Sequence, residues 1–373
     1  MATATSIPTA SASFPLQRKA PRGPRIDTTP TLFPDVPNQR DSGPDALSPP
    51  EPAPERVGIA RLALSSPLAD AKRGTEYFLL PVKSILNHCE STRVPFSWTV
   101  NPYRGCEFGC QYCYARYTHE YMELDGHDFE KKIYVKQDAG PLAGRDLGKE
   151  KVRGEHIAIG TATDPYQPAE REFGATRAIL EQMAARKGLS ISITTKSDQV
   201  LRDIDLLHRI GEHSCVSVNL SITTLRTRLA RILEPRAPRP DLRLKAVQEL
   251  RRAGIAAGVF AMPILPGITD REEDLDALAR AARDAGAQWF AGSVLFLMPS
   301  AKEQFLPFLD AKFPKLARQY REWFTRAAYA PEDYRREISG RIRALRKKYG
   351  LGVRPLDPGR PIESDQQLSL GLE

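Results

Sequence analysis

Short β-rich runs alternate with amphipathic helical stretches through the middle of this chain. Leu and Ala recur at helical spacing in four stretches, and a glycine follows three of them, as is typical of helix ends: Ala175 to Lys187, Gln199 to Glu212, Asp241 to Ala253 and Arg271 to Ala285. The expected strands are Ser97 to Pro102, His156 to Thr163, Leu189 to Thr195, Cys215 to Ile222, Ile255 to Pro263 and Trp289 to Met298. Strands that alternate with helices form parallel sheets, and right-handed crossovers curl such a sheet. The sequence therefore predicts an α/β fold, a partial (β/α)6 TIM-type barrel whose chemistry lies at the carboxyl ends of the strands.

The two ends of the chain differ from this pattern. Twelve of the 31 prolines lie in the first 60 residues, mixed with Ser, Thr and Arg and with almost no apolar periodicity. Such a segment cannot offset its ordering entropy by burial. We expect residues 1–60 to be a disordered tail, residues 61–351 to form the partial barrel with flanking helices, and residues 352–373 to be a flexible tail.

Charge and hydropathy limit the location and the partners of the protein. No run reaches the roughly 18 consecutive apolar residues of a membrane helix, and the first 25 residues lack the apolar core of a secretory signal. Five cysteines in 373 residues are typical of a reducing compartment, so we expect a cytoplasmic protein without membrane contact. The formal charge of +8 permits a polyanionic partner without requiring one.

Three of the five cysteines, Cys106, Cys110 and Cys113, lie on a glycine-bearing loop that follows the first expected barrel strand. A structural zinc site is closed by four ligands, and the nearest fourth candidates are His88, Cys89 and His119. The compartment and the odd number of thiols disfavour a disulfide. Three thiolates on one loop suit an iron–sulfur cluster that leaves one iron open to a ligand.

The pattern Cys106-x-x-x-Cys110-x-x-Cys113, with the aromatic Tyr112 before the last cysteine and a β/α barrel around it, resembles the radical S-adenosylmethionine (SAM) superfamily. The resemblance implies a [4Fe-4S] cluster on the three cysteines, with SAM bound to its fourth iron. One-electron reduction, by flavodoxin or ferredoxin, would cleave SAM to methionine and a 5′-deoxyadenosyl radical that abstracts hydrogen from a substrate. The protein's own task would be to position the reactants and to exclude water.

The same resemblance suggests which strand ends hold SAM. The superfamily uses the end of the second strand for the methionine amino group, and here that end carries Thr163 and Asp164. Lys196 ends the third strand and is expected to bind the SAM carboxylate; the alternative is an ordinary surface lysine. Ser221 at the end of the fourth strand is expected near the ribose or carboxylate, and Tyr112 beside the cluster and adenine.

More locally, the stretch from Gly74 to Asp270 is similar to the spore photoproduct lyase-like branch, also called DNA repair photolyase-like. The similarity rests on the segments NPYRGCEFGCQYCYAR, GTATDPYQPAE, TTKS and MPILPG. In that branch the tyrosines that flank the third cysteine are implicated in returning hydrogen, which implies catalytic roles for Tyr112 and Tyr114. The lyase also has a donor cysteine soon after its cluster, whereas this chain has none between Cys113 and Cys215. We expect Cys215 to be a core residue, with Cys89 as an alternative auxiliary thiol.

Two further features are compatible with DNA as a partner. Residues 226–252 carry nine basic against three acidic side chains, and residues 312–348 carry twelve against four, with Tyr320, Trp323, Tyr329 and Tyr334 interleaved in the second segment. Ordinary solvated helix faces are the alternative. Gln367 to Leu372 resembles the short peptide by which bacterial repair proteins bind the sliding clamp.

The leading hypothesis is a radical SAM enzyme that acts on nucleic acid, with a DNA lesion as substrate and a lyase-like reaction. A radical SAM enzyme that modifies a protein, RNA or small metabolite is one alternative. A non-catalytic, metal-stabilised binding module is the other.

Overall fold

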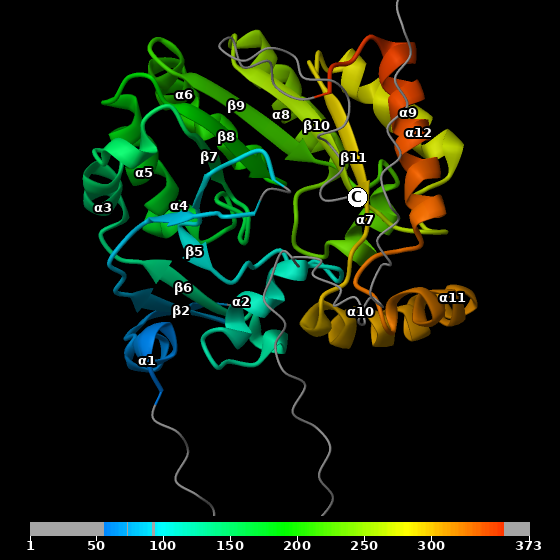
Figure 1. Ribbon diagram of the computed structural model, residues 1–373, viewed down its shortest axis with the longest axis horizontal. Helices are drawn as coiled ribbons and strands as arrows, with labels where there is room; N and C mark the ends of the chain where they lie inside the picture. Colours follow the sequence, from blue (N-terminus) through cyan, green and yellow to red (C-terminus); the bar gives the residue numbers. More distant parts are fainter. Residues whose placement is uncertain (1–55, 73, 92–93, 354–373) are drawn as a thin grey trace, which may run out of the picture. The chain divides into compact units, whose positions relative to one another are not determined.

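The computed structural model describes residues 56–353, apart from residues 73, 92 and 93. All six predicted barrel strands are present as parallel neighbours in one seven-stranded sheet, to which β3 adds an antiparallel edge (Figure 1). The sheet order is β11-β10-β9-β8-β7-β4-β3, and the two edge strands do not pair with each other within the described residues. The partial barrel is therefore open. Its strands are β3 (Leu86–His88), β4 (Trp98–Val100), β7 (His156–Ile159), β8 (Ser190–Thr195), β9 (Cys215–Ser221), β10 (Ala256–Ile264) and β11 (Phe290–Val294).

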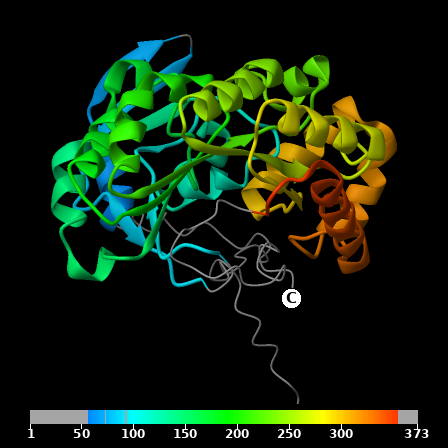
Figure 2. The same ribbon diagram turned by 90° about the horizontal axis from the view of Figure 1, so that it is seen from above.

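Helices connect successive barrel strands and form a layer on the outer side of the sheet (Figures 1 and 2). The four predicted helices are confirmed as α5 (Ala175–Ala184), η4 with α6 (Asp198–Asp203 and Ile204–Gly211), α8 (Pro240–Arg252) and α9 (Glu272–Asp284). Each carries an apolar stripe against the strands, which is the geometry that a right-handed β/α crossover requires.

A second, four-stranded sheet was not predicted. It has the order β1-β2-β6-β5 and consists of β1 (Leu68–Lys72), β2 (Thr75–Leu80), β6 (Lys132–Lys136) and β5 (Tyr103–Arg104). Helix α1 (Gly58–Ser65), which begins inside the segment expected to be tail, contributes Ala63 to a small cluster with Leu80, Met122 and Tyr134. This sheet carries the strand β5, which leads directly into the cysteine loop.

Most of the remaining helices lie near the cysteine loop or near the β11 edge of the barrel. They are α2 (Tyr117–Glu120), α3 (Ala139–Asp146), α4 (Glu170–Phe173), α7 (Thr227–Leu233), α10 (Pro299–Lys312), α11 (Pro314–Phe324) and α12 (Glu332–Tyr349), with the short turns η1 (Tyr114–Arg116), η2 (Gly126–Asp128) and η3 (Glu150–Val152). Helix α10 packs against η1 and α2, and α12 packs against β11 and α9, whereas α3 packs against α5. No helix in the described part of the chain is long and apolar enough to cross a membrane.

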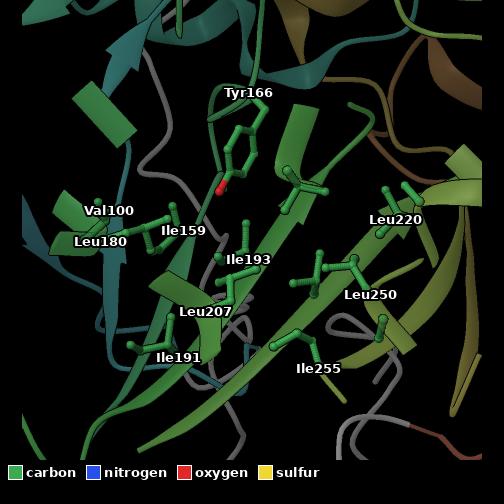
Figure 3. Close-up of a cluster of buried hydrophobic side chains, with 14 of the residues drawn as sticks. Val100, Ile159, Tyr166, Leu180, Ile191, Ile193, Leu207, Leu220, Leu250 and Ile255 are labelled. Atoms are coloured by element: carbon green, nitrogen blue, oxygen red, sulfur yellow. The ribbon is translucent and has the colours of Figure 1, made fainter. Parts of the chain in front are cut away.

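The main core lies between the barrel strands and their helices. Figure 3 shows strand residues such as Ile159, Ile193 and Leu220 together with Leu207 and Leu250 from the helices, all of them buried. One large side chain, Trp289, is also buried, and its indole N–H donates to Asn219 Oδ1 at 3.0 Å. A Cβ on Gly258 would lie 2.4 Å from the indole ring, so this position has room only for glycine.

Candidate functional site

The cysteine loop begins where β5 ends, one short strand later than the sequence predicts. Gly105, the residue before Cys106, has a φ of +83°, which favours glycine. A Cβ there would lie 2.7 Å from the Lys132 carbonyl oxygen and 2.8 Å from that of Phe129. The Cys106 amide donates to the same Phe129 carbonyl at 3.0 Å. The loop is thus pressed against the backbone that leads into β6.

The segment after β7 holds the loop from the other side. Thr163 Oγ1 and Gln167 Nε2 donate to the Gly105 carbonyl at 2.6 Å and 3.1 Å, and the Glu107 amide donates to Gln167 Oε1 at 3.0 Å. The Glu107 carboxylate accepts from the Ala169 amide at 2.7 Å and from the Tyr77 hydroxyl at 2.9 Å. The Thr163 hydroxyl, predicted to bind SAM, is therefore bonded to the loop itself.

The three thiols of the loop are free cysteines. Burial raises the pKa of each thiol, that of Cys110 to about 12, so binding of a metal must displace their protons. Among the described residues, no three His, Cys, Asp or Glu side chains are grouped as ligands of a single metal ion. The thiolates of an iron–sulfur cluster bind different irons, and three thiols on one loop fit a [4Fe-4S] cluster with one iron left open.

A buried charged network fixes Tyr112. Its hydroxyl donates to the Glu234 carboxylate in a short hydrogen bond and lies 3.0 Å from Thr223 Oγ1. Glu234 also forms an ion pair of 2.5 Å with Arg243, and both side chains are 1% exposed. Burial opposes the charge on Glu234, but Arg243 and Lys196 hold its pKa below the usual range. A carboxylate is thus kept ionised behind the cluster loop.

Lys196 and Asp164, both predicted to bind SAM, lie together beside this network. Lys196 Nζ lies 5.8 Å from the centre of the Tyr112 ring. Burial works against the charge on Lys196, yet Cys110 and Glu234 raise its pKa above the ordinary value. The Asp164 carboxylate accepts from Thr195 Oγ1 at 2.6 Å, from the Lys196 amide at 2.7 Å and from the Tyr166 amide at 3.0 Å. Asp164 therefore orders the strand end that presents Lys196.

Ser221, the last predicted SAM residue, ends β9 and is buried. Its carbonyl oxygen accepts from Arg243 Nη1 at 2.9 Å, so the same arginine that pairs with Glu234 fixes this strand end. The structure brings Tyr112, Lys196 and Ser221 to one network through Glu234 and Arg243. Their contacts with SAM stay predictions.

Aromatic rings form a row beside the third cysteine. Tyr114, whose hydroxyl donates to the Thr161 carbonyl, lies 6.4 Å from Tyr117 and 5.0 Å from Phe296 between ring centres. The row continues from Tyr117 to Tyr121 at 5.4 Å, and from Phe296 to Tyr329 at 5.7 Å, where the Arg335 guanidinium lies over the ring. We call Tyr114, Tyr117, Tyr121, Phe296 and Tyr329 the aromatic row.

Other candidates lie away from the loop or in different surroundings. Cys215 begins β9, at the opposite end from the strand ends that carry the site, but it is half-buried and does not belong to the core as predicted. Cys89 follows β3 and lies near enough to Tyr117 to contribute to its raised pKa, which burial chiefly causes. Tyr320, predicted as part of a basic groove, is fully buried and donates to the Pro266 carbonyl at 2.8 Å. Gln367 to Leu372 lie outside the described residues.

Sequence reasoning missed four residues that fix the site: Glu107, Gln167, Glu234 and Arg243. Glu107 and Gln167 lie inside the segments NPYRGCEFGCQYCYAR and GTATDPYQPAE, which carry the family resemblance, and this is the signal that points to them. Glu234 and Arg243 carry no such signal, because neither the net positive charge of residues 226–252 nor the helix predicted over Asp241 to Ala253 identifies a site residue.

The protein is similar to known proteins both in sequence and in fold. The sequence model of the Radical SAM superfamily matches residues 100–279. An uncharacterised protein of Mycobacterium tuberculosis is 35% identical over 311 residues, which cover 82% of this chain and 90% of that protein. An uncharacterised protein of Methanocaldococcus jannaschii is 34% identical over 182 residues, covering 48% of this chain and 66% of that protein.

Among solved structures, a spore photoproduct lyase variant with a dinucleoside spore photoproduct has a similar fold. Its TM-score is 0.55 at 16% identity, over 73% of this chain and 79% of that chain. Another variant of the lyase, with bound AdoMet and the dinucleoside, gives a TM-score of 0.55 at 15% identity over 80% and 84% of the two chains. Together with the cysteine loop, these findings show that the chain belongs to the radical SAM superfamily of enzymes, which use a [4Fe-4S] cluster and SAM.

Proposed function

We propose that this enzyme acts on nucleic acid and that its substrate is a DNA lesion. The aromatic row beside Cys113 carries this proposal. Rings in series, with a guanidinium over the last of them, are the surface on which bases of an unpaired strand stack. Tyr121 at the end of the row is 45% exposed, so a base can reach it from solvent.

The fold likeness to spore photoproduct lyase supports the same substrate class, since that lyase was solved with a dinucleoside photoproduct. The distribution of charge gives weaker support than the sequence suggested. Arg243 from the first basic segment is buried against Glu234, and Tyr320 from the second is part of the core. Many of the other basic side chains of those segments form ion pairs with acidic neighbours: Arg226, Arg239, Arg252, Arg318, Arg321, Arg336, Arg341 and Lys348.

In this proposal Cys106, Cys110 and Cys113 hold the cluster, and Lys196 binds the SAM carboxylate next to Tyr112. When bound and reduced, the cluster and SAM would supply the radical chemistry that removes a hydrogen atom from the lesion. The chain itself must hold these groups in place and exclude water around them. Ser221 and Asp164 act by fixing the strand ends that surround Lys196 and the network.

The hydroxyl bonds of the two tyrosines assign them different tasks. The Tyr112 hydroxyl is bonded inside a buried charged network, and returning a hydrogen from it would remove one of the donors to Glu234, which Thr223 and Arg243 also contact. The Tyr114 hydroxyl gives up only a bond to the Thr161 backbone carbonyl. We therefore assign hydrogen return to Tyr114 and a positioning role to Tyr112. The tyrosyl radical left on Tyr114 would take up one electron from the same reductant that reduces the cluster, together with one proton.

The test is anaerobic turnover of the reconstituted enzyme with dithionite and SAM, with 5′-deoxyadenosine quantified with and without ultraviolet-irradiated DNA. We expect product to rise with irradiated DNA and not with intact DNA. Tyr114→Phe should still form 5′-deoxyadenosine but lose repaired product, while Tyr121→Phe, which keeps its ring, should repair as the wild type does. Product that rises with a protein, RNA or metabolite instead of DNA would overturn the proposed substrate.

Reduced flavodoxin or ferredoxin is the proposed electron donor in the cell, and the cytoplasm is the proposed location. Replacing dithionite by either reduced protein should sustain 5′-deoxyadenosine formation. Docking of Gln367 to Leu372 on a sliding clamp stays a prediction, which a pull-down with and without these residues tests.

A further inference from the structure

Lys136, the last residue of β6, is 5% exposed and has no counter-ion. Its ammonium has neither a hydrogen bond nor an ion pair within the described part of the chain, and Arg104 is the charged group that acts on it. Burial and this like charge lower the Lys136 pKa to about 7. A buried amine next to a second cation is costly unless an anion joins them.

Arg104 lies beside Lys136 on the same face of the small sheet. In the antiparallel pairing of β5 with β6, Arg104 is opposite Tyr134, two residues before Lys136, so the two basic side chains are diagonal neighbours. The Nε of Arg104 is buried without a hydrogen-bond partner, and its Nη1 has one long contact, 3.5 Å from the Thr118 carbonyl. We call these two side chains the Arg104–Lys136 pair.

The other two buried basic side chains near the site, Arg116 and Arg243, each have a carboxylate partner. Arg116, fully buried near the same loop, forms an ion pair of 2.7 Å with Glu130. Arg243 has Glu234 at 2.5 Å. Within the described residues, the Arg104–Lys136 pair has no such carboxylate.

Tyr117 connects the pair to the aromatic row. The ring of Tyr117 is stacked on Tyr114 at an interplanar angle of 18°. Tyr117 also lies near enough to Arg104 for each side chain to shift the pKa of the other. Tyr117 therefore lies between the Arg104–Lys136 pair and Tyr114, the residue that follows Cys113. Two cations without a carboxylate partner can bind the oxyanion of a nucleotide, and the neighbouring aromatic rings can stack on its base.

We propose that the Arg104–Lys136 pair binds a phosphate group of a nucleotide, with its base against the aromatic row. The choice of a nucleotide as ligand rests on the proposed function, whereas the need for an anion rests on the pair alone. A lysine and an arginine together supply donors and charge for a phosphate, either the terminal phosphate of a mononucleotide or a backbone phosphate of a strand.

The test measures binding to the reconstituted full chain without turnover, by anaerobic calorimetry. The probes are inorganic phosphate, thymidine, thymidine 5′-monophosphate and a short oligothymidylate. Wild type is compared with Lys136→Met, Lys136→Arg and the control Lys131→Met, which removes an exposed lysine just before the same strand. Thermal unfolding with and without phosphate is a second readout.

We expect Lys136→Met to bind the phosphate-bearing probes at least about tenfold more weakly, because one charge-assisted contact is lost. The salt slope of oligothymidylate binding should fall by about 0.7, the contribution of one phosphate contact on a single strand. Phosphate should raise the melting temperature of the wild type but not of Lys136→Met. Lys136→Arg should retain binding, and Lys131→Met should match the wild type.

The outcomes separate this inference from the proposed function. If Lys136→Met binds every probe as the wild type does, the phosphate site is wrong, whatever DNA does to turnover. If binding depends on Lys136 while no nucleic acid stimulates 5′-deoxyadenosine formation, the anion site stands and the DNA substrate falls. Binding of the oligonucleotide without the mononucleotide identifies a backbone phosphate, and equal binding of both identifies a terminal one.

Discussion

Replacing Gly105 by alanine should damage the site far more than the conformation of one residue explains. Gly105 and Gly154 both have φ near +80°, at +83° and +75°, so alanine at either should cost about 1 kcal/mol of unfolding free energy. A Cβ on Gly154 meets nothing within 4 Å, whereas one on Gly105 overlaps two backbone carbonyls. Gly154→Ala is therefore the matched control.

The extra cost follows from the bonds that hold the loop. If Gly105 moves away from the carbonyls, the hydrogen bonds from Thr163 and Gln167 and the one from the Glu107 amide are lost. At about 1 kcal/mol each, Gly105→Ala should cost about 4 kcal/mol in total, against about 1 kcal/mol for the control. Urea unfolding of the metal-free chain and iron content after reconstitution measure both effects. A fully loaded Gly105→Ala variant that is no less stable than Gly154→Ala would refute the reasoning.

Three further predictions concern buried charges. Burial lowers the pKa of His119 to about 4, so the unfolded chain binds its proton first as pH falls below about 6.5. The free energy of unfolding of the wild type should then fall by about 3 kcal/mol relative to that of His119→Gln between pH 6.5 and 4. Urea titrations at each pH measure this difference, and equal pH profiles of the two proteins would contradict the prediction. Arg243→Met leaves the Glu234 charge buried and should cost about 3–5 kcal/mol by the same method, with a smaller loss when Glu234→Gln is added; a double variant less stable than the single one would argue against it. Lys196→Met should weaken SAM binding to the reconstituted enzyme at least about tenfold by calorimetry, while Lys187→Met, at an exposed site, should not; unchanged affinity would remove Lys196 from the site.

The barrel could be predicted because its signals are local. Each parallel strand is a short apolar run that precedes a helix with its own periodicity, and all six strands are confirmed. The second sheet could not be predicted, since β2 finds β6 more than 50 residues later and each strand is brief. In the site, too, the local feature could be predicted and the long-range one could not. The three cysteines form one motif, whereas Tyr112 and Glu234 are 122 residues apart, and nothing in either segment indicates that they are in contact.

The cysteine loop is anchored by hydrogen bonds to other protein groups, none of which requires a metal. Its backbone is bonded to the segments around Phe129 and Gln167, and Tyr112 is held by a carboxylate that has its own counter-ion. A small zinc domain, by contrast, gains most of its order from the metal. We therefore expect a chain that has lost its cluster to oxygen to keep its fold and the positions of its three cysteines. Such a chain should be able to take up a new cluster.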